Sequence, residues 1–493
     1  MKTVSKKLRF LILALISVFA LTTIFPLLNG VVKASAETTK TITVFSWEDY
    51  IDLGTEDAEE DYLKESILDI FEEQTGIHVN YQTFATNEEM YNEIKKDPTA
   101  CDIVCPSEYM IMKMRDEEMI QPYYAPENYV QYGSPYIKNV FKDIGLTLDN
   151  GQTYAVGYMW GTMGYIYNME KYTSEDLKHW SSILNDKFKG KVTIKDSIRD
   201  TYIMAIAMVY EEDLLSLDKT ASDYTAKVQA IFNRAEPDDI LQVESKLQEI
   251  RGYLYGFEVD SGKSDIVTGK IDVNFAWSGD AVAAIEEADA VGKSLGYVVP
   301  EEGSNVWFDG LVLTKNADVE NSLKFIDFLC DPHNAIRNMD YIGYVSCIGG
   351  EDVFDYVCDN YAVENGDTFV DLNYFFNDSG VSDDRYIVCT SKGGVEYQMF
   401  NAQYPSQEVI KRCAVMENFG NDTLVTMNAM WSRVKLITLS PLAIILIVVA
   451  IVLCVALIIV YKYKDKIFKT KIPKKKANVK PNEFKVVGKE EIR

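Results

Sequence analysis

The fold of this chain is decided by two stretches, G-K-I-D-V-N-F-A-W-S-G-D-A-V-A-A-I (residues 269–285) and G-Y-V-V-P-E-E-G-S-N-V-W-F-D-G-L-V-L-T (residues 296–314). In residues 273–277 apolar side chains alternate with polar or small ones, which predicts a short strand. A helix with an acidic first turn is expected to follow at once. Trp277 and Asp280 therefore lie at a strand-to-helix junction, where open α/β sheets place their ligands.

The second stretch predicts two more strands, and the later one, residues 306–313, carries Trp307 and Asp309. Two residues apart on a strand, these side chains point to the same face. Like Trp277 and Asp280, they form an aromatic–carboxylate pair. An aromatic face attracts an organic ammonium by about 0.5–2 kcal/mol, and a carboxylate accepts its N–H groups with charge assistance. Two core tryptophans and a helix-capping aspartate are the alternative, and these residues alone leave it open.

Length and charge limit the class of protein. A chain of 493 residues predicts two domains or two lobes. The net charge is −26, although residues 1–36 carry five Lys or Arg and no acid, and residues 462–493 carry twelve against four acids. The middle of the chain is therefore more acidic than the whole. Such a surface repels nucleic acid and anionic lipid and attracts cations.

Two segments carry membrane signals. Residues 1–36 combine a basic start, a long apolar run and an A-x-A site, which predicts an export signal, either cleaved or kept as an anchor. Residues 436–461 are nearly all apolar, and about 20 such residues span a bilayer. The Lys-rich tail at 462–493 is then expected in the cytoplasm and residues 37–435 outside. The predicted localisation is the cell membrane, with an extracytoplasmic binding domain.

The exported part begins with a β-α-β-α-β rhythm, which predicts a parallel sheet with helical crossovers. Its expected elements are a strand at 40–45, a helix at 62–75, a strand at 77–83, a helix from residue 87 and a strand at 102–105. Polar and aromatic residues follow these strand ends: Trp47, Tyr50, Ser107 and Tyr109. Further on we expect strands at 154–167 and 191–194, helices over most of 202–210, 221–256 and 321–329, a turn with exposed aromatics at 341–346, and terminal helices within 407–435. Residues 350–405 show weak periodicity.

No catalytic motif is present in the sequence. Phosphate loops, nucleophile elbows, zinc-protease helices and dinucleotide fingerprints are all missing, and the three histidines are isolated. The eight cysteines have no zinc-type spacing, and Cys101 and Cys105 are expected in the core. We therefore predict no catalytic residue, no metal, no cofactor and no enzymatic activity.

Eight motifs in order resemble the spermidine/putrescine-binding proteins of ABC transporters, over about residues 40–350 and more faintly over 405–435. They are W-x-x-Y at 47–50, N-E-E-M-Y at 87–91, D-I-V-C-P-S-E-Y at 102–109, V-G-Y-M-W-G-T at 156–162, D-S-I-R-D at 196–200, V-N-F-A-W-S-G-D at 273–280, W-F-D-G-L-V-L at 307–313 and Y-I-G-Y at 341–344. The resemblance implies an α/β, two-lobed periplasmic-binding-protein fold of type II with parallel-rich sheets. Lobe 1 would comprise 37–158 and 300–350, and lobe 2 would comprise 159–299 and 351–435.

The resemblance also implies ligand-binding residues. The aromatic residues Trp47, Tyr50, Tyr109, Trp277, Trp307 and Tyr344 look like a box around a polyamine chain. Ser107 looks like a hydrogen-bonding residue, Asp309 like the central carboxylate and Asp200 like the acid for a terminal amine. Asp280 matches a carboxylate of putrescine-preferring members, and Ser197 stands where some members have Asp. On physical grounds we expect Asp200, Asp280 and Asp309 to be neutralised only by a bound cation.

The implied function is a receptor, tethered by residues 436–461, that captures putrescine or spermidine and delivers it to an ABC permease. The ATPase would be a separate chain, because this sequence has no phosphate loop. A receptor for a sugar or another small solute, a membrane-anchored extracellular enzyme and a polyamine sensor remain open. The choice between putrescine and spermidine is also open.

Overall fold

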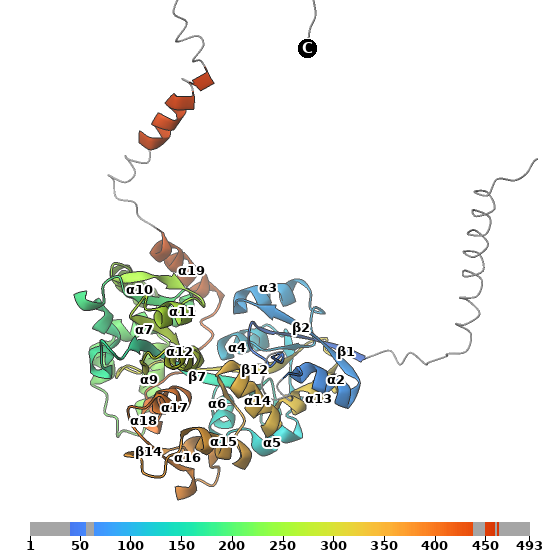
Figure 1. The fold of residues 1–493 in the computed structure, drawn as a ribbon. Helices are drawn as coiled ribbons and strands as arrows, with labels where there is room; N and C mark the ends of the chain where they lie inside the picture. Colours follow the sequence, from blue (N-terminus) through green and yellow to red (C-terminus); the bar gives the residue numbers. More distant parts are fainter. Residues whose placement is uncertain (1–39, 56–63, 437–448, 459–460, 463–493) are drawn as a thin grey trace, which may run out of the picture. The chain divides into compact units, whose positions relative to one another are not determined.

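The residues that the computed structural model describes are 40–55, 64–436, 449–458 and 461–462, and Figure 1 shows their ribbon. The chain divides into two compact units, Met1–Val434 and Lys435–Arg493. Both predicted lobes belong to the first unit, except for Lys435, the last residue of predicted lobe 2. The predicted export signal, residues 1–36, lies outside the described residues.

Lobe 1 is built around β1 (Lys40–Trp47), which lies between β2 (Ile77–Phe84) and β3 (Ile103–Val104) and pairs with both in parallel. The connecting helices are α2 (Ile67–Thr75) and α3 (Asn87–Lys96). This confirms the predicted β-α-β-α-β rhythm. It also places the residues that follow β1 and β3 at one edge of the sheet.

The first helix starts later than predicted. Ser66 accepts a hydrogen bond from the Leu68 N–H at 3.1 Å, so α2 begins at Ile67 rather than at residue 62. Its end was correctly predicted at Gly76, where a positive φ of 70° favours glycine.

Lobe 2 contains a second set of strands around β10. They are β7 (Val156–Asn168), β8 (Val192–Lys195), β9 (Leu254–Glu258), β10 (Val273–Trp277) and β11 (Leu295–Val298). β8 is parallel to β10 and to β9, whereas β7 is antiparallel to β10 and β11. Each lobe thus combines parallel pairs with antiparallel ones.

Two long strands join the lobes. β12 (Val306–Thr314) is antiparallel to β3 in lobe 1 and to β7, giving the strand order β2-β1-β3-β12-β7-β10-β8-β9. Every residue of β7 and β12 is buried. At Gly161, a Cβ atom would overlap the Trp307 ring and the Ser278 hydroxyl, so the close approach of these strands to α12 (Ser278–Ala290) requires glycine.

Helices cover the sheets of both lobes. The remaining elements up to residue 350 are α4 (Glu108–Asp116), β4 (Ile120–Gln121), β5 (Tyr123–Tyr124), α5 (Glu127–Tyr132), α6 (Pro135–Asp143), β6 (Gln152–Thr153), α7 (Ile198–Val209), α8 (Glu211–Leu215), α9 (Tyr224–Phe232), α10 (Pro237–Arg251), α11 (Gly262–Thr268), α13 (Val319–Leu329), α14 (Pro332–Ile342) and β13 (Val345–Ser346), with short 3₁₀ turns at Ser174–Leu177, Trp180–Leu184 and Asp186–Phe188.

The segment after residue 350 is more ordered than its periodicity predicts. Its elements are α15 (Glu351–Tyr361), β14 (Thr368–Asp371), α16 (Asn373–Phe376), β15 (Ile387–Thr390), α17 (Val395–Gln403), α18 (Gln407–Lys411) and α19 (Asn421–Lys435), with a 3₁₀ turn at Asp384–Tyr386. α16 packs on α6 of lobe 1, whereas α17 packs on α12 and β11 of lobe 2. The assignment of residues 351–435 to lobe 2 stays a prediction.

Two local predictions were wrong. Residues 254–258 form β9 instead of continuing the predicted helical region, because they pair with β8. Tyr344 is only partly accessible rather than exposed, because its hydroxyl donates a hydrogen bond to Asp280 and its ring contacts Tyr50. The prediction for the cysteines was correct: Cys101 and Cys105 are buried, and the described cysteines form no disulfide.

The predicted membrane span at 436–461 falls partly outside the described residues, which omit 437–448 and 459–460. Within the described parts of the chain, no helix has the length and apolar character needed to cross a membrane. Residues 449–458 are helical and exposed.

Candidate functional site

Three of the predicted residues, Tyr50, Ser107 and Tyr109, lie around the carboxylate of a fourth, Asp309 in β12. The Tyr50 hydroxyl donates to Asp309 Oδ2 at 2.6 Å, and Ser107 forms an isolated β-bridge with Asp309. The Asn87 side-chain amide donates to Ser107 Oγ at 3.1 Å and to the Tyr109 hydroxyl at 3.0 Å. Asp309 Oδ1 is buried and has no hydrogen-bond partner among the described residues.

A second group forms at the junction of β10 and α12. The Tyr344 hydroxyl donates to Asp280 Oδ1 at 3.0 Å, which links the two lobes. The Lys195 ammonium lies 2.8 Å from Asp280 Oδ2 and 3.2 Å from Glu258 Oε1. The same ammonium is 4.3 Å from the centroid of the Trp277 ring.

Aromatic contacts connect the two groups. Tyr344 packs edge-on against Tyr50 at a centroid distance of 5.6 Å and against Trp307 at 5.5 Å. The Trp47 ring packs instead on the Phe84 ring, at a centroid distance of 4.6 Å. The structure therefore brings three of the six predicted box residues into ring contact, with Tyr344 between Tyr50 and Trp307.

Burial changes the acidity of the carboxyl groups here. Burial raises the pKa of Asp309 to about 6, opposed by the Tyr50 hydroxyl and the Ser107 side chain and reinforced by the charge of Asp200. Burial likewise raises the pKa of Asp200 to about 6, although Ser197, Lys195 and the Trp277 side chain favour its ionised form. Asp309 and Asp200 are therefore the acids that we still expect a bound cation to neutralise.

Asp280 differs from this prediction, because the chain itself neutralises it. Burial disfavours the charge of Asp280, but Lys195 and Lys263 outweigh burial and hold its pKa below the ordinary value. Lys263 is the more distant, with its Nζ 3.7 Å from Asp280 Oδ1. The expectation that only a bound cation would neutralise Asp280 is therefore wrong.

Some residues of the site were missed from the sequence. They are Asn87, Glu108, Tyr158, Lys195, Arg199 and Glu258. Burial raises the pKa of Glu108 to about 8, and its Oε2 accepts the Phe308 N–H at 3.0 Å. The position of Glu108 between Ser107 and Tyr109 was a usable signal. The sequence contains no such signal for Lys195 and Glu258, because only the pairing of β8 with β9 and β10 brings them close to Asp280.

The sequence model of one protein family, bacterial extracellular solute-binding protein, matches residues 66–350. The chain belongs to this family. The match covers more than half of the 493 residues and includes Asp309, Asp280 and Tyr344, whereas Trp47 and Tyr50 precede it.

Relatives of this solute-binding protein confirm the resemblance seen in its motifs. The "Spermidine/putrescine-binding periplasmic protein" of Escherichia coli K12 is 26% identical over 320 residues, which are 64% of this chain and 80% of the relative. The "Putrescine-binding periplasmic protein SpuD" of Pseudomonas aeruginosa is 26% identical over 315 residues, covering 61% and 76% of the two chains.

Solved structures show the same fold. The "Putative spermidine/putrescine ABC transporter from Listeria monocytogenes" has a TM-score of 0.58 and 25% identity, over 80% of this chain and 99% of that one. The substrate-binding protein of a spermidine/putrescine ABC transporter from Streptococcus pneumoniae has a TM-score of 0.54 and 24% identity, over 80% and 98%. The predicted α/β periplasmic-binding-protein-like fold is confirmed.

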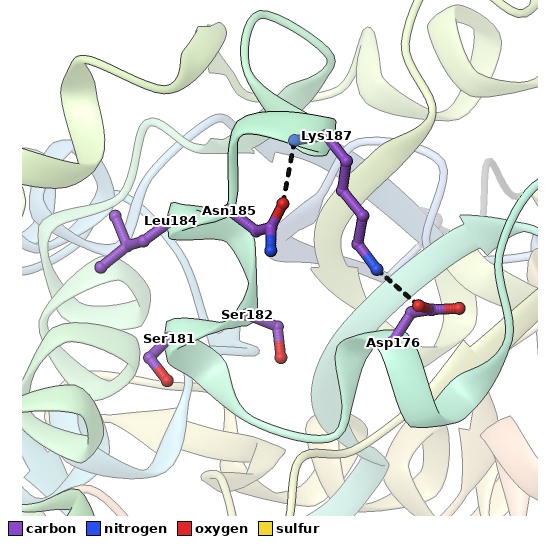
Figure 2. Close-up of a pocket in the computed structure, with 6 residues that line it drawn as sticks. All are labelled: Asp176, Ser181, Ser182, Leu184, Asn185 and Lys187. Carbon is purple, nitrogen blue, oxygen red and sulfur yellow. Dashed lines mark hydrogen bonds and ion pairs between the residues drawn. The ribbon is translucent and has the colours of Figure 1, made fainter.

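Two hollows lie outside the aromatic–carboxylate cluster. One, of about 340 Å³, lies among the 3₁₀ turns of lobe 2, where Lys187 pairs with Asp176 at 2.5 Å and donates its N–H to Asn185 (Figure 2). Its lining contains no aromatic side chain and none of the predicted site residues. The other, of about 390 Å³, is lined by α3, α4 and α19 and borders the cluster through Tyr109 and Arg199.

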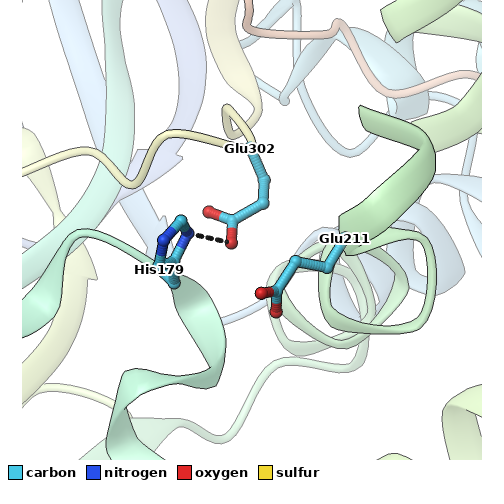
Figure 3. Close-up of side chains that lie close together, drawn as sticks. All are labelled: His179, Glu211 and Glu302. Carbon is cyan, nitrogen blue, oxygen red and sulfur yellow. Dashed lines mark hydrogen bonds and ion pairs between the residues drawn. The ribbon is translucent and has the colours of Figure 1, made fainter. Parts of the chain in front are cut away.

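One group of side chains has the donor types of a metal site. Atoms of His179, Glu211 and Glu302 lie within 4.8 Å of one another (Figure 3). His179 Nδ1 is 2.9 Å from Glu302 Oε1, so a hydrogen bond between these side chains accounts for this contact. Imidazole and carboxylate donors suit a divalent ion such as zinc. No residue of this group belongs to the predicted ligand site.

Proposed function

We propose that this solute-binding protein captures a polyamine, putrescine or spermidine, between its two lobes. The observation that carries the proposal is Asp309, whose Oδ1 is buried without a partner among the described residues. A buried carboxylate oxygen without a donor is unfavourable by about 1–3 kcal/mol or more. An ammonium group of a ligand supplies that donor together with the opposite charge.

The surrounding side chains suit the rest of a polyamine. Tyr50, Trp307 and Tyr344 present apolar ring surface beside Asp309, and methylene spacers of a polyamine pack on such surface. Relatives named for spermidine and putrescine support this choice of ligand. The acidic exterior supports it as well, because a field of that sign attracts polycations.

We further propose that residues 436–461 tether the receptor beside an ABC permease, with the basic tail in the cytoplasm and a separate ATPase. The described helix at 449–458 exposes apolar side chains, including Ile451 at 57% and Leu457 at 68%. Lysines dominate the tail that follows. Tethering raises the effective concentration of the loaded receptor at the permease.

An enzyme is the alternative of a different class. Asp200 and Asp309, with pKa values of about 6, and Glu108, at about 8, have the perturbed acidity that a general acid or base needs. The carboxyl groups of a buried cation-binding site have raised pKa values for a different reason, because burial disfavours their charge until the cationic ligand binds. We therefore propose binding without turnover, and unchanged polyamine after prolonged incubation with the protein is the expected result.

A thermal-shift experiment on the full chain in an uncharged detergent tests the proposed function. Putrescine or spermidine is expected to raise the melting temperature, because a ligand that binds only the folded state stabilises it. The shift should decrease as salt screens the site. Maltose is the control for a sugar receptor, and a salt-independent shift by maltose with none by either amine would contradict the proposal.

A further inference from the structure

Lys195 is a buried cation at the end of β8, with 0% exposure. Its Nζ lies 2.8 Å from Asp280 Oδ2, 3.2 Å from Glu258 Oε1 and 2.9 Å from the Val259 carbonyl oxygen. An ammonium has three N–H donors, so each donor of Lys195 has an acceptor. Burial lowers the pKa of Lys195, but Asp280 and Glu258 outweigh burial and raise it above the ordinary value. Lys195 is therefore a fully satisfied, charged group.

Lys195 makes the two contacts that an amine ligand would otherwise make with Trp277 and Asp280. Its Nζ is 4.3 Å from the Trp277 ring centroid, which is a cation–π contact. Its ion pair with Asp280 is the carboxylate contact. Thus Trp277 and Asp280 bind an ammonium that belongs to the chain itself.

The other end of the cluster is different. Asp309 Oδ1 is buried with no partner in the described part of the chain, and the charges of Asp309 and Asp200 repel each other. The only other cation against the predicted box residues is Arg199, among the described cation–ring contacts, and its Cζ lies 4.1 Å from the Tyr109 ring centroid. Asp309 Oδ1 therefore remains without a donor among the described residues, and the pKa of Asp200 stays raised to about 6 although Lys195 and Arg199 favour its ionised form.

We propose that Lys195 is a built-in occupant of the Trp277–Asp280 amine position and limits the ligand to a short diamine held at Asp309 and Asp200. This inference rests on the proposed function and extends it to ligand choice. A third ammonium on a longer polyamine must either approach the Lys195 charge or displace it from three acceptors, and both are unfavourable in a buried site. The wild-type chain should therefore bind putrescine more tightly than spermidine.

Calorimetric titration of the full chain in an uncharged detergent tests the ranking. The expected result is a dissociation constant for putrescine about tenfold or more below that for spermidine. Tighter binding of spermidine by the wild-type chain overturns the inference and leaves the proposed function intact. Absence of heat with either amine at millimolar concentration overturns the proposed function, and the inference with it.

A pair of variants tests the role of Lys195. Lys195→Ala removes the internal ammonium and is expected to shift the ratio of the two constants about tenfold toward spermidine. Lys263→Ala removes a nearby charge that is 3.7 Å from Asp280 and makes no ring contact with Trp277, so its ratio should stay at the wild-type value. A folded Lys195→Ala variant with the wild-type ratio overturns the inference. If that variant does not fold, the wild-type ranking alone decides.

Discussion

Asp309 combines a buried oxygen without a partner and a hydrogen bond from Tyr50. The substitution Asp309→Asn removes the negative charge and keeps an oxygen for the Tyr50 hydroxyl. We predict a loss of polyamine affinity of about 100-fold or more, because breaking a buried charge pair costs 2–5 kcal/mol or more. Thermal stability at pH 7 should be at least that of wild type, because the unbound site no longer buries a charge. Calorimetry and a melting curve measure both, and undiminished affinity would contradict the assignment of Asp309.

Binding should depend on pH through Asp309 and Asp200. Their pKa values of about 6 mean that both carry protons at pH 5 and are mostly ionised at pH 7.5. A cation binds the ionised forms, so affinity for putrescine is predicted to rise between these pH values and to level off above them. Titrations at several pH values check this. A flat profile would show that neither carboxylate is required to ionise on binding.

In the unbound protein, the contribution of Asp309 to the free energy of unfolding should fall as pH rises, whereas the affinity for putrescine should rise. Because its folded pKa is about 6 and its ordinary value is 3.8, the folded state binds more protons between these values. The free energy of unfolding therefore falls by up to about 3 kcal/mol as pH rises through this window. Comparing the free energy of unfolding of Asp309→Asn with that of wild type at pH 4 and pH 7 isolates the contribution of Asp309. The predicted gain from the substitution is larger at pH 7, and equal effects at both would contradict it.

Contact between the lobes depends on a glycine in α12. At Gly279 a Cβ atom would overlap the Tyr344 ring, which holds Asp280 and contacts Tyr50 and Trp307. Gly279→Ala is predicted to separate Tyr344 from α12 and to weaken polyamine binding by about tenfold or more. Alanine has the higher helix propensity, by about 1 kcal/mol, so a loss of binding would come from the clash rather than from helix fraying.

A matched control exists in the same lobe. Gly256 lies in β9, and a Cβ atom there would meet nothing within 4 Å. Gly256→Ala should therefore leave affinity at the wild-type value in the same calorimetric experiment. Equal losses from Gly279→Ala and Gly256→Ala would remove the argument for a specific contact between Tyr344 and α12.

Most elements could be predicted because their periodicity is local. β7, β12 and α12 were all recognised from residue alternation or from a strand-to-helix junction. β9 was missed because its strand character depends on pairing with β8, which lies about sixty residues earlier in the chain. The helices between 351 and 403 were not predicted, and their packing is non-local: α16 contacts α6, and α17 contacts α12 and β11.

The same distinction applies to the site. Aromatic and acidic residues at strand ends could be predicted as site residues from motifs. Tyr50 is hydrogen-bonded to Asp309 and Tyr344 to Asp280, and a ring contact between the two tyrosines links the pairs. The pairing of Asp280 with Lys195 could not be predicted, because 85 positions separate the two residues. Sequence spacing indicates which residues can bind a cation, whereas only the folded structure shows which of them are already paired with a cation of the chain itself.

At the scale of the whole molecule, the proposed tether and the binding site belong to different units. Residues from Lys435 onward form a compact unit of their own. Truncation after residue 435 is predicted to release the receptor from the membrane without changing its affinity for polyamine, because the site residues all precede that point. Membrane fractionation and titration of the truncated chain check the two claims. A truncated chain that still sediments with membranes would contradict tethering by 436–461, unless the export segment is retained as an anchor, which N-terminal sequencing determines.

The central claim is that the cluster around Asp309 binds an organic polycation. Calorimetric titration of the full chain with putrescine, at low and at high salt, tests it most directly. The account predicts binding at about micromolar concentration or tighter, weakened by salt because the attraction is electrostatic. No heat with putrescine or spermidine, from a sample that melts cooperatively, would contradict the claim and leave only the fold and the family established.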